Sequence, residues 1–399
     1  MDVAVSVHGA FQRLRRHVET LQTIGDLDVI FLWPWHPSAW NDEAKANLAA
    51  LRDLWGLGGY VELVFSRLTG QEVELGILLR TWFERWFRRA GGEGNAATMR
   101  AIVEITGRNP PDLIFAHRLG AILPAIRGLA GKRPVVIDLD DVEHIRMQRE
   151  AHARPWRERP RFLLAAWLTK QLESEALAGA TAALVCSQAD ARFLRRVGRK
   201  GDIAILPNAA LEQEVLPPAA DPVALFVGMV RYWPNAQGLI WLVRDVWPLV
   251  RHALPAARLI VAGLGSDELD LADDAAGVQT LGFVADLKPL YAAARIAVCP
   301  LHIASGTRIK IIEAAMFART TLSTTIGAEG LAFETGRDIV LADGTAAFAE
   351  ACVDLLGDRE RCLRSGLAAR ETARRLHSPA AVSERLKALC AKALEATNS

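Results

Sequence analysis

The segment "RIAVCPLHIASGTRIKIIEAAMFARTTLSTT" (residues 295–325) decides the fold of this chain. It opens with a short apolar run at 295–301 and closes with a second one at 319–325. Between them, a polar loop with a glycine leads into a stretch whose apolar residues recur at three- and four-residue spacing. Short apolar runs are typical of buried strands, and the wider spacing is typical of helices. The segment therefore predicts a strand, a loop, a helix and a second strand, which is the repeating unit of a parallel sheet covered by helices.

The same alternation runs through the chain in two blocks. In the first block we expect strands at 27–33, 111–117, 133–140, 181–187 and 203–208, and helices at 42–55, 75–90, 96–107 and 160–178. In the second we expect strands at 223–228, 257–263, 278–284, 295–301 and 319–325, with helical spacing over 235–254. The fold class is thus α/β, with two parallel sheets in two Rossmann-like domains. The predicted divisions are an N-terminal domain at 1–210, a proline-rich linker at 211–222, a C-terminal domain at 223–378 and a final helix at 379–399.

The composition narrows the class of protein. The 399 residues are 51% hydrophobic and 23% charged, which indicates a globular chain rather than a disordered one. The formal net charge of +1 argues against a dedicated nucleic-acid binder. The five cysteines are scattered and form no C-x-x-C pair, which favours a reducing compartment and indicates neither a disulfide framework nor a zinc site.

We expect a cytoplasmic protein. The first residues lack the basic flank and apolar core of a signal peptide, and no apolar run reaches the roughly 18 residues that span a bilayer. The stretch "LGILLRTWFERWFRRA" (75–90) places leucine and tryptophan on one face and arginine elsewhere. Such a helix either packs on its own sheet, the interpretation we favour, or makes a peripheral contact with the inner face of the cell membrane.

Two cations stand at the start of the predicted helix within 295–325. Arg308 and Lys310 fall in its first turn, where unpaired N–H groups and the positive end of the dipole disfavour cations. A bound phosphate would make both tolerable, with Gly306 allowing close backbone approach and Thr307 adding a hydroxyl. The alternative, which this segment alone leaves open, is that both side chains point into solvent.

Glu313 projects within the apolar arc of the same helix, and a carboxylate there needs partners. One interpretation is a structural ion pair with Arg308 or Lys310. The other is that Glu313 binds hydroxyl groups, as acidic residues bind ribose in nucleotide sites. A phosphate site and a hydroxyl site one helical turn apart predict a nucleotide-diphosphate ligand.

Four motifs carry a family resemblance: "PNAA" (207–210), "LFVGMVRYWPNAQGLIWLVRDVWPLVRHALPAARLIVAG" (225–263), "LGFVADLKPLYAAARIAVCPL" (281–301) and "GTRIKIIEAAMFARTTLSTTIGAEGL" (306–331). They resemble glycosyltransferase family 4 of the GT-B class (glycosyl transferases group 1). The resemblance implies two Rossmann-like domains that face each other across a cleft. The C-terminal domain would hold a nucleotide-diphospho-sugar and the N-terminal domain the acceptor, with the final helix returning to the N-terminal domain.

The resemblance also assigns donor-binding residues. Glu313 matches the family glutamate that binds the donor ribose, and Val284 sits where backbone commonly contacts the base. Gly306 and Thr307 match the loop whose amides hold the diphosphate, and a "G-x-R-x-K" variant of that loop includes Arg308 and Lys310.

The C-terminal half departs from the family at two positions. Ser305 stands where many members have a second glutamate near the donor sugar. Met229 replaces an arginine that follows the glycine ending the first C-terminal strand, here Gly228. We infer that Arg231, together with Arg308 and Lys310, supplies the missing positive charge.

The N-terminal half departs further. Asp140 stands where members often have a histidine near the reacting sugar carbon, and Asp141 and His144 follow it. Asp140 or Asp141 could accept the acceptor's proton as a general base. The alternative is that Asp138 and Asp140 orient neighbouring loops.

Three further residues are expected at the acceptor side of the cleft. Gly9 lies in "HGAFQRLRRHV" (8–18), which resembles the family's first loop, near the donor phosphate or the acceptor. His117 and Arg118 end a predicted strand and are expected to contact the acceptor, with a structural role as the alternative.

These features predict a metal-independent glycosyltransferase without a cofactor. The triplet "DLD" (138–140) matches a metal-binding D-x-D pattern, but three-residue patterns are common by chance and this one lies in the acceptor half. The enzyme would move a hexosyl or related residue to a glycan or lipid-linked acceptor in the synthesis of a cell-surface or exported glycan. Retention of configuration is implied by the family resemblance alone. The alternatives are a nucleotide-sugar epimerase or hydrolase on the same fold, and a non-catalytic scaffold in a glycan-assembly complex.

Overall fold

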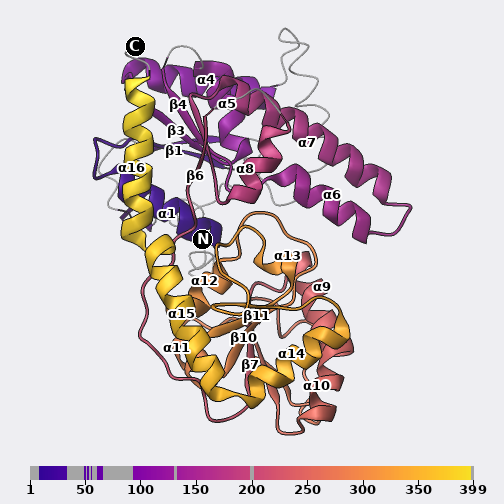
Figure 1. Cartoon of the computed structure of the whole chain (residues 1–399). Coiled ribbons are helices and arrows are strands. Elements are labelled where there is room, and N and C mark those ends of the chain that lie inside the picture. The colour runs from indigo at the N-terminus through magenta and orange to yellow at the C-terminus, as the bar shows by residue number, and fades with distance from the viewer. Residues whose placement is uncertain are drawn as a thin grey trace. The chain divides into compact units, whose positions relative to one another are not determined.

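The computed structural model describes residues 9–33, 49–50, 52–53, 55, 61–65, 93–129, 133–197 and 202–396 of the chain. The chain divides into two compact units, each with its own parallel sheets (Figure 1). Unit 1 comprises Met1–Leu206 with Ser383–Ser399, and unit 2 comprises Pro207–Val382. The stretch 75–90 and most of the expected helix at 42–55 lie outside the described residues.

Unit 1 contains a four-stranded parallel sheet in the order β3-β4-β5-β6. Its strands are β3 (Ile114–His117), β4 (Val135–Asp138), β5 (Ala182–Val185) and β6 (Asp202–Ile205), which confirm the four strands predicted between 111 and 208. A separate parallel pair joins β1 (Val29–Trp33), which was predicted, to β2 (Val61–Phe65), which was not. Every residue of β4 is buried, as expected for an inner strand with helices on both faces.

Seven helices belong wholly or mainly to the described part of unit 1: α1 (Gly9–Leu21), α4 (Glu93–Arg108), α5 (Leu119–Leu129), α6 (Glu143–Ala153), α7 (Arg159–Gly179), α8 (Gln188–Arg195) and α16 (Pro379–Glu395). Ile122 of α5 and Leu168 of α7 are fully buried in one core with Ile137 of β4. The expectation of a loop over 8–18 was wrong, because the described residues from Gly9 onward are helical.

The final helix α16 packs in unit 1 from Ser383 onward (Figure 1). The hydroxyl groups of Thr20 and Ser383 lie 2.6 Å apart in a hydrogen bond. Farther along the helix, Lys392 forms an ion pair with Asp202 at the start of β6. The chain therefore crosses between the two units twice, at 206–207 and at 382–383.

Unit 2 contains a six-stranded parallel sheet in the order β12-β11-β10-β7-β8-β9. Its strands are β7 (Val223–Val227), β8 (Arg258–Ala262), β9 (Val278–Thr280), β10 (Ile296–Cys299), β11 (Thr320–Ser323) and β12 (Val340–Leu341). The first five confirm the strands predicted for the second block. All six carboxyl ends lie at one edge of the sheet, so the loops that follow the strands are gathered there.

The helical stretch predicted over 235–254 is divided into three parts: α9 (Trp233–Trp241), the π-helical turn η3 (Leu242–Val246) and α10 (Trp247–Ala253). Pro248 lies in the first turn of α10. It has no N–H to continue the α-helical ladder, and its ring crowds the carbonyl four residues earlier. The preceding turn widens instead, and the Trp247 N–H donates to the Leu242 carbonyl.

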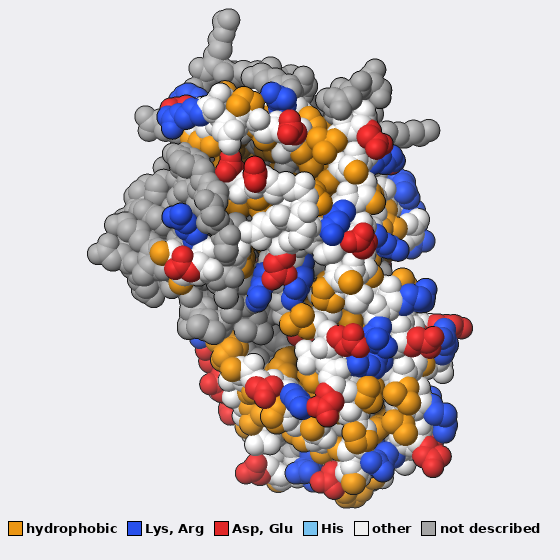
Figure 2. Space-filling model, turned by 90° about the vertical axis from the view of Figure 1, so that its left-hand side faces the viewer, with side chains coloured by type: hydrophobic (Ala, Val, Ile, Leu, Met, Phe, Trp, Pro, Cys, Tyr) orange, Lys and Arg blue, Asp and Glu red, His pale blue; other side chains and the backbone are white. Residues whose placement is uncertain are grey.

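The remaining helices of unit 2 are α11 (Lys288–Ala293), α12 (Ile309–Met316), α13 (Thr325–Ala328), α14 (Thr345–Gly357) and α15 (Arg359–His377). Phe226, Trp247 and Phe348 form part of the core. Figure 2 shows a face on which acidic and basic side chains are interspersed, in keeping with a net charge of +1. Among the described residues, none of the helices has both the length and the apolar character needed to cross a membrane.

Candidate functional site

The loop between β10 and α12 carries the predicted donor motif. Gly306 has φ 67°, in the left-handed region that favours glycine. Arg308 has extended backbone angles and caps the helix, which begins at Ile309. Lys310 therefore lies in the first turn, as predicted, whereas Arg308 precedes the helix. The free N–H groups of this first turn make the loop a suitable place for an anion.

Lys310 connects this helix start to the carboxyl end of β7. Its Nζ donates to Asn235 Oδ1 at 2.9 Å and lies 4.3 Å from the centre of the Phe226 ring. A Cβ atom at Gly228 would stand 2.5 Å from the same Nζ, so the glycine provides the space that the ammonium occupies. Burial lowers the pKa of Lys310. A half-buried ammonium in this position is stabilised by any anion that binds beside it.

Arg308 is placed differently from Lys310. Its side chain is buried, and its guanidinium donates to the backbone carbonyls of Ser305, at 3.2 Å, and Glu329. Thr307 Oγ1 accepts a 3.0 Å hydrogen bond from Asn208 Nδ2, within the "PNAA" motif. These contacts fix the loop from both sides. The structure thus gives Arg308 and Thr307 roles in shaping the loop.

The other predicted donor residues lie at separate points of unit 2. Glu313 is half-buried one turn into α12, and Val284 lies in the loop between β9 and α11. Arg231 is exposed, and its Nε lies 3.1 Å from each carboxylate oxygen of Glu268. Ser305 Oγ is buried and has no hydrogen-bond partner among the described residues. An unpartnered hydroxyl beside a helix start leaves a donor available to a ligand.

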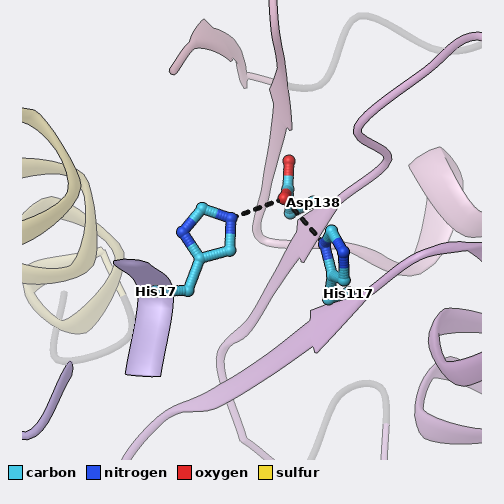
Figure 3. A group of neighbouring side chains, drawn as sticks. All are labelled: His17, His117 and Asp138. Atoms are coloured by element: carbon cyan, nitrogen blue, oxygen red, sulfur yellow. Dashed lines mark hydrogen bonds and ion pairs between the residues drawn. The ribbon is translucent and has the colours of Figure 1, made fainter. Parts of the chain in front are cut away.

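In unit 1, the carboxyl ends of β3 and β4 meet at Asp138, which is fully buried (Figure 3). One of its oxygens lies 2.7 Å from His17 Nε2 and 2.8 Å from His117 Nδ1. Arg13 of α1 makes a two-pronged ion pair with the same carboxylate, at 2.6 and 2.8 Å. Burial alone would raise the pKa of Asp138, but Arg13 and the two histidines outweigh it and hold that pKa well below its usual range.

Arg118 directly follows β3, and Asp140 lies two residues after the end of β4. Both residues have left-handed backbone, with φ of 65° for Arg118 and 60° for Asp140. Only one other non-glycine residue among the described ones has positive φ, namely Ala318. The Arg118 guanidinium lies 3.1 Å from an Asp140 carboxylate oxygen, so the two strained residues hold each other. Such conformations cost about 1–3 kcal/mol each and tend to persist at functional sites.

Asp140 and Asp141, the two predicted catalytic carboxylates, have opposite electrostatic surroundings. Burial opposes ionisation of Asp140, but Arg118 and Arg13 prevail and lower its pKa. The pKa of Asp141 is raised well above its usual value by burial and then by the charges of Asp140 and Glu143. Arg118 lowers the pKa of Asp141 but is outweighed by these causes. Adjacent carboxyl groups with divergent pKa values are a recurrent feature of acid–base sites.

The remaining predicted residues lie apart from this pair. His144 is buried in α6, and its Nδ1 is hydrogen-bonded to the Glu173 carboxylate of α7, which indicates a role in joining the two helices. Gly9 begins α1. His117 and Arg118 lie at the carboxyl end of β3, as predicted, and both contact an aspartate of the neighbouring strand end.

Arg13 and His17 were not among the residues predicted from the sequence. Both are buried on α1, as is Thr20. Spacing of four and three residues places these polar side chains on one helical face. The helical spacing of these polar residues could have indicated a buried polar face on a helix. It was not recognised, because residues 8–18 were expected to form a loop.

His17, His117 and Asp138 are a candidate metal site, because one potential ligand atom from each lies within 4.8 Å of the others. Arg13 already contacts both oxygens of Asp138. A divalent cation bound there would face a guanidinium at close range, which Coulomb repulsion disfavours. Burial also lowers the pKa of His17 to about 4, so the imidazole is neutral, with Nε2 bonded to the carboxylate and Nδ1 buried without a hydrogen-bond partner among the described residues. The residues fit a hydrogen-bonded cluster better than a metal centre.

Comparison with known proteins identifies the fold. Residues 221–358 match the family described as glycosyl transferases group 1. A 135-residue segment is 30% identical to an uncharacterized 44.6 kDa protein in the cps region of Klebsiella pneumoniae, covering 32% of this chain and 35% of the relative. The chain thus matches about one third of the length of that curated relative.

Three solved structures resemble the chain over most of its length. They are the HepE protein of Anabaena in complex with UDP and glucose (15% identity, 95% of each chain, TM-score 0.65), a glycosyltransferase from Rickettsia africae (13% identity, 97% of this chain and 96% of that one, TM-score 0.65) and the sucrose-phosphate synthase of Thermosynechococcus elongatus (16% identity, 89% and 94%, TM-score 0.62). Together with the two parallel sheets, they confirm the predicted GT-B fold of two Rossmann-like domains.

Proposed function

We propose that this protein transfers a sugar from a nucleotide-diphospho-sugar to an acceptor hydroxyl. The observation that carries the proposal is Lys310, whose half-buried ammonium joins the start of α12 to the end of β7 beside Gly228. The match of 221–358 to glycosyl transferases group 1 supports the reaction class. The UDP and glucose bound to HepE support a nucleotide-sugar donor by analogy.

In this proposal, unit 2 holds the donor. The diphosphate lies at the first turn of α12, where free N–H groups and the helix dipole favour an anion. Lys310 supplies the main positive charge, the Gly306 backbone permits close approach, and Ser305 Oγ donates a hydrogen bond. Arg308 holds the loop in shape through its carbonyl contacts. Glu313, one turn farther along the helix, accepts hydrogen bonds from the ribose hydroxyls.

Unit 1 receives the acceptor in this proposal. Asp141 is the better proton acceptor of the two neighbouring carboxylates, because a raised pKa brings a base nearer to the operating pH. Asp140 remains ionised beside Arg118 and serves as a fixed negative charge. His117, oriented by Asp138, lies at the end of the adjacent strand and can hydrogen-bond to an acceptor hydroxyl.

The finer points rest on the family resemblance and on one relative. We propose retention of anomeric configuration and catalysis without a metal. The relative in the cps region of Klebsiella pneumoniae supports a role in polysaccharide synthesis, and hence a cell-surface or exported glycan as the product. The acceptor would be a growing glycan or a lipid-linked sugar handled on the cytoplasmic side.

The proposal is tested by nucleotide binding to Lys310→Ala. UDP, GDP and ADP are first compared by thermal shift, and the nucleotide that stabilises the protein is titrated alongside its nucleoside. Removing a charge-assisted hydrogen bond costs about 1.5–3 kcal/mol, so diphosphate affinity should fall by roughly tenfold or more. Nucleoside affinity should change little. Lys288→Ala is the matched control, because Lys288 is an exposed lysine of unit 2 whose Nζ pairs with Glu214.

Product analysis separates the rival functions. Release of nucleoside diphosphate that requires an acceptor, with a new glycosidic product, supports transfer. Consumption of donor without any acceptor would instead indicate an epimerase or a hydrolase. Binding without turnover for every donor–acceptor pair would indicate a scaffold. Equal loss of nucleoside and diphosphate affinity in Lys310→Ala, or no loss, would refute the placement of the donor.

A further inference from the structure

The helical hairpin formed by α6 and α7 in unit 1 carries an exposed apolar patch. The hairpin patch consists of Trp156, Leu163, Leu164 and Trp167, which are 72%, 43%, 39% and 45% exposed. Among the described residues, thirteen large apolar side chains are strongly exposed, and four of them fall within these twelve positions. Single exposed apolar residues are ordinary, but a contiguous group indicates an interaction surface.

The patch occupies one side of α7. At about 100° per residue, Leu163, Trp167 and Leu164 fall within a single arc of about 100°. Leu168 and Leu172 lie about 40° and 80° beyond Leu164 on the same projection, and both are buried in the core of unit 1. The apolar surface of the helix is therefore wider than the part that its own unit covers. Figure 1 shows α6 and α7 extending outward from the sheet of unit 1, joined by the turn that contains Trp156.

Basic side chains border the patch. Residues 156–167 contain three arginines and one glutamate, a net charge of +2. On the helical projection, Lys170 lies about 20° beyond Leu163. Arg161 lies about 60° beyond Leu164, at the angle of the buried Leu168 and Leu172, but it is exposed because it belongs to the first turn of α7. The Arg157 guanidinium lies 5.3 Å from the centre of the Trp156 ring. Long cationic side chains can reach the phosphate groups of lipids while the neighbouring apolar side chains are buried away from water.

We propose that the hairpin patch is a docking surface for an anionic lipid bilayer. Tryptophan favours the boundary between headgroups and acyl chains, and flanking arginines favour negatively charged lipid. Among the tryptophans whose burial is described, Trp156 and Trp167 are the exposed ones, whereas Trp233 and Trp241 are half-buried and Trp55 and Trp247 are buried. The surface is separate in sequence from the stretch 75–90, and it would bring unit 1 to a membrane.

The inference is independent of the proposed activity, because its test requires no donor and no turnover. The full-length protein is sedimented with vesicles of phosphatidylcholine, and with vesicles of equal parts phosphatidylcholine and phosphatidylglycerol. We expect partitioning onto the mixed vesicles and little onto the neutral ones. The double variant W156S/W167S should lose at least about tenfold of this partitioning. The variant R157Q/R161Q should lose about fivefold for each charge on the mixed vesicles, with no change on the neutral ones.

Two controls separate this surface from others. L363A/L367A removes two exposed leucines from α15, which is also rich in arginine, and should bind vesicles as the parent does. W156F/W167F keeps the apolar character, so it should still bind, but quenching of tryptophan emission by brominated lipid should largely disappear.

Three results would overturn the proposal: unchanged partitioning of W156S/W167S, an equal loss in L363A/L367A, or quenching that persists in W156F/W167F. A fourth would redirect it. If W156S/W167S changes the oligomeric state in solution while leaving vesicle binding intact, the patch is a contact between copies of this chain and not a lipid surface. Circular dichroism and the melting temperature confirm that each variant is folded, which the exposure of all four side chains favours.

Discussion

Three carboxylates within four residues acquire different chemistry from their surroundings. Asp138 lies beneath Arg13 and two histidines and is held ionised. Asp140 is paired with Arg118, whereas Asp141 has carboxylate neighbours and no ion pair among the described residues. Desolvation raises the pKa of all three, and the presence or absence of a cation decides the result.

Asp141→Asn should stabilise the protein at neutral and alkaline pH. The raised pKa means that the folded state binds the Asp141 proton more tightly than the unfolded chain does. Stability from this group is complete below the unfolded pKa near 4 and is lost as pH rises towards the folded value. Asparagine removes the cost of ionisation. Melting curves should show a higher Tm at about pH 8, by roughly 2–4 °C for each kcal/mol, and no difference at about pH 4.

Asp140→Asn is the control of opposite sign. The lowered pKa of Asp140 contributes stability above the unfolded value, and that stability is lost as pH falls through the folded one. The variant should therefore melt below the parent at neutral pH and approach it in acid. In turnover, Asp141→Asn should also remove the rise of rate with pH that a base with a raised pKa produces. A shift of the same sign in both variants would contradict the assignment.

The sequence could nominate these residues but could not rank them. Asp138, Asp140 and Asp141 look alike in the motif. The cations that distinguish them are Arg13, 125 positions from Asp138, and Arg118, 22 positions from Asp140. Lys310 was predictable because its misplacement at a helix start is a local feature. Arg308, next to it in the same motif, turned towards the carbonyls of Ser305 and Glu329, and the second of these contacts depends on a loop 21 positions later.

At the scale of the element, apolar runs predicted the strands well because a parallel strand is buried on both faces and needs no partner to be identified. The helix predicted over 235–254 shows where the pattern was insufficient. Its apolar spacing continues through the break, yet Pro248 cannot donate to the ladder and the turn before it becomes π-helical. Pro248 in the sequence indicated this break, but the prediction of one helix relied on the apolar spacing alone.

The packing of α15 against the turn after α12 gives a prediction at this scale. A Cβ atom at Gly366 would lie 2.0 Å from the Ala318 carbonyl oxygen, which is backbone and cannot rotate away. Gly366→Ala should therefore push α15 from the turn at Ala318 and cost about 1–3 kcal/mol, measured by urea unfolding. The loop with Gly306 leads into the other end of α12, so a shift of this helix should lower nucleotide affinity as well.

Gly357→Ala is the matched control, because a Cβ atom there would meet nothing within 4 Å. Gly357 ends α14, and alanine lowers the conformational entropy of the unfolded chain. This variant should be neutral or up to about 1 kcal/mol more stable. If both substitutions had the same effect, helix propensity would explain them and the close approach at Ala318 would not.

At the scale of the whole molecule, the alternation of strands and helices in two blocks predicted two parallel sheets, and the confirmed GT-B fold agrees with this. The path of the C-terminal helix was expected from the family resemblance alone. Its contacts in unit 1, such as Thr20 with Ser383, link positions 363 apart. A local sequence pattern does not show which distant residues will be in contact. Contacts such as this one therefore could not be predicted from the single sequence.

The division into two units predicts how a nucleotide stabilises the molecule. A ligand that binds only native unit 2, at about one hundred times its Kd, stabilises that unit by about 2.7 kcal/mol. Hydrogen exchange of the most protected amides in β7 and β10 should then slow by about a hundredfold. The buried amides of β4 and β5 should keep their rates, because unit 1 has its own sheet and core. Equal slowing in both units would mean that they unfold as one body, and slowing in unit 1 alone would place the nucleotide in the other sheet.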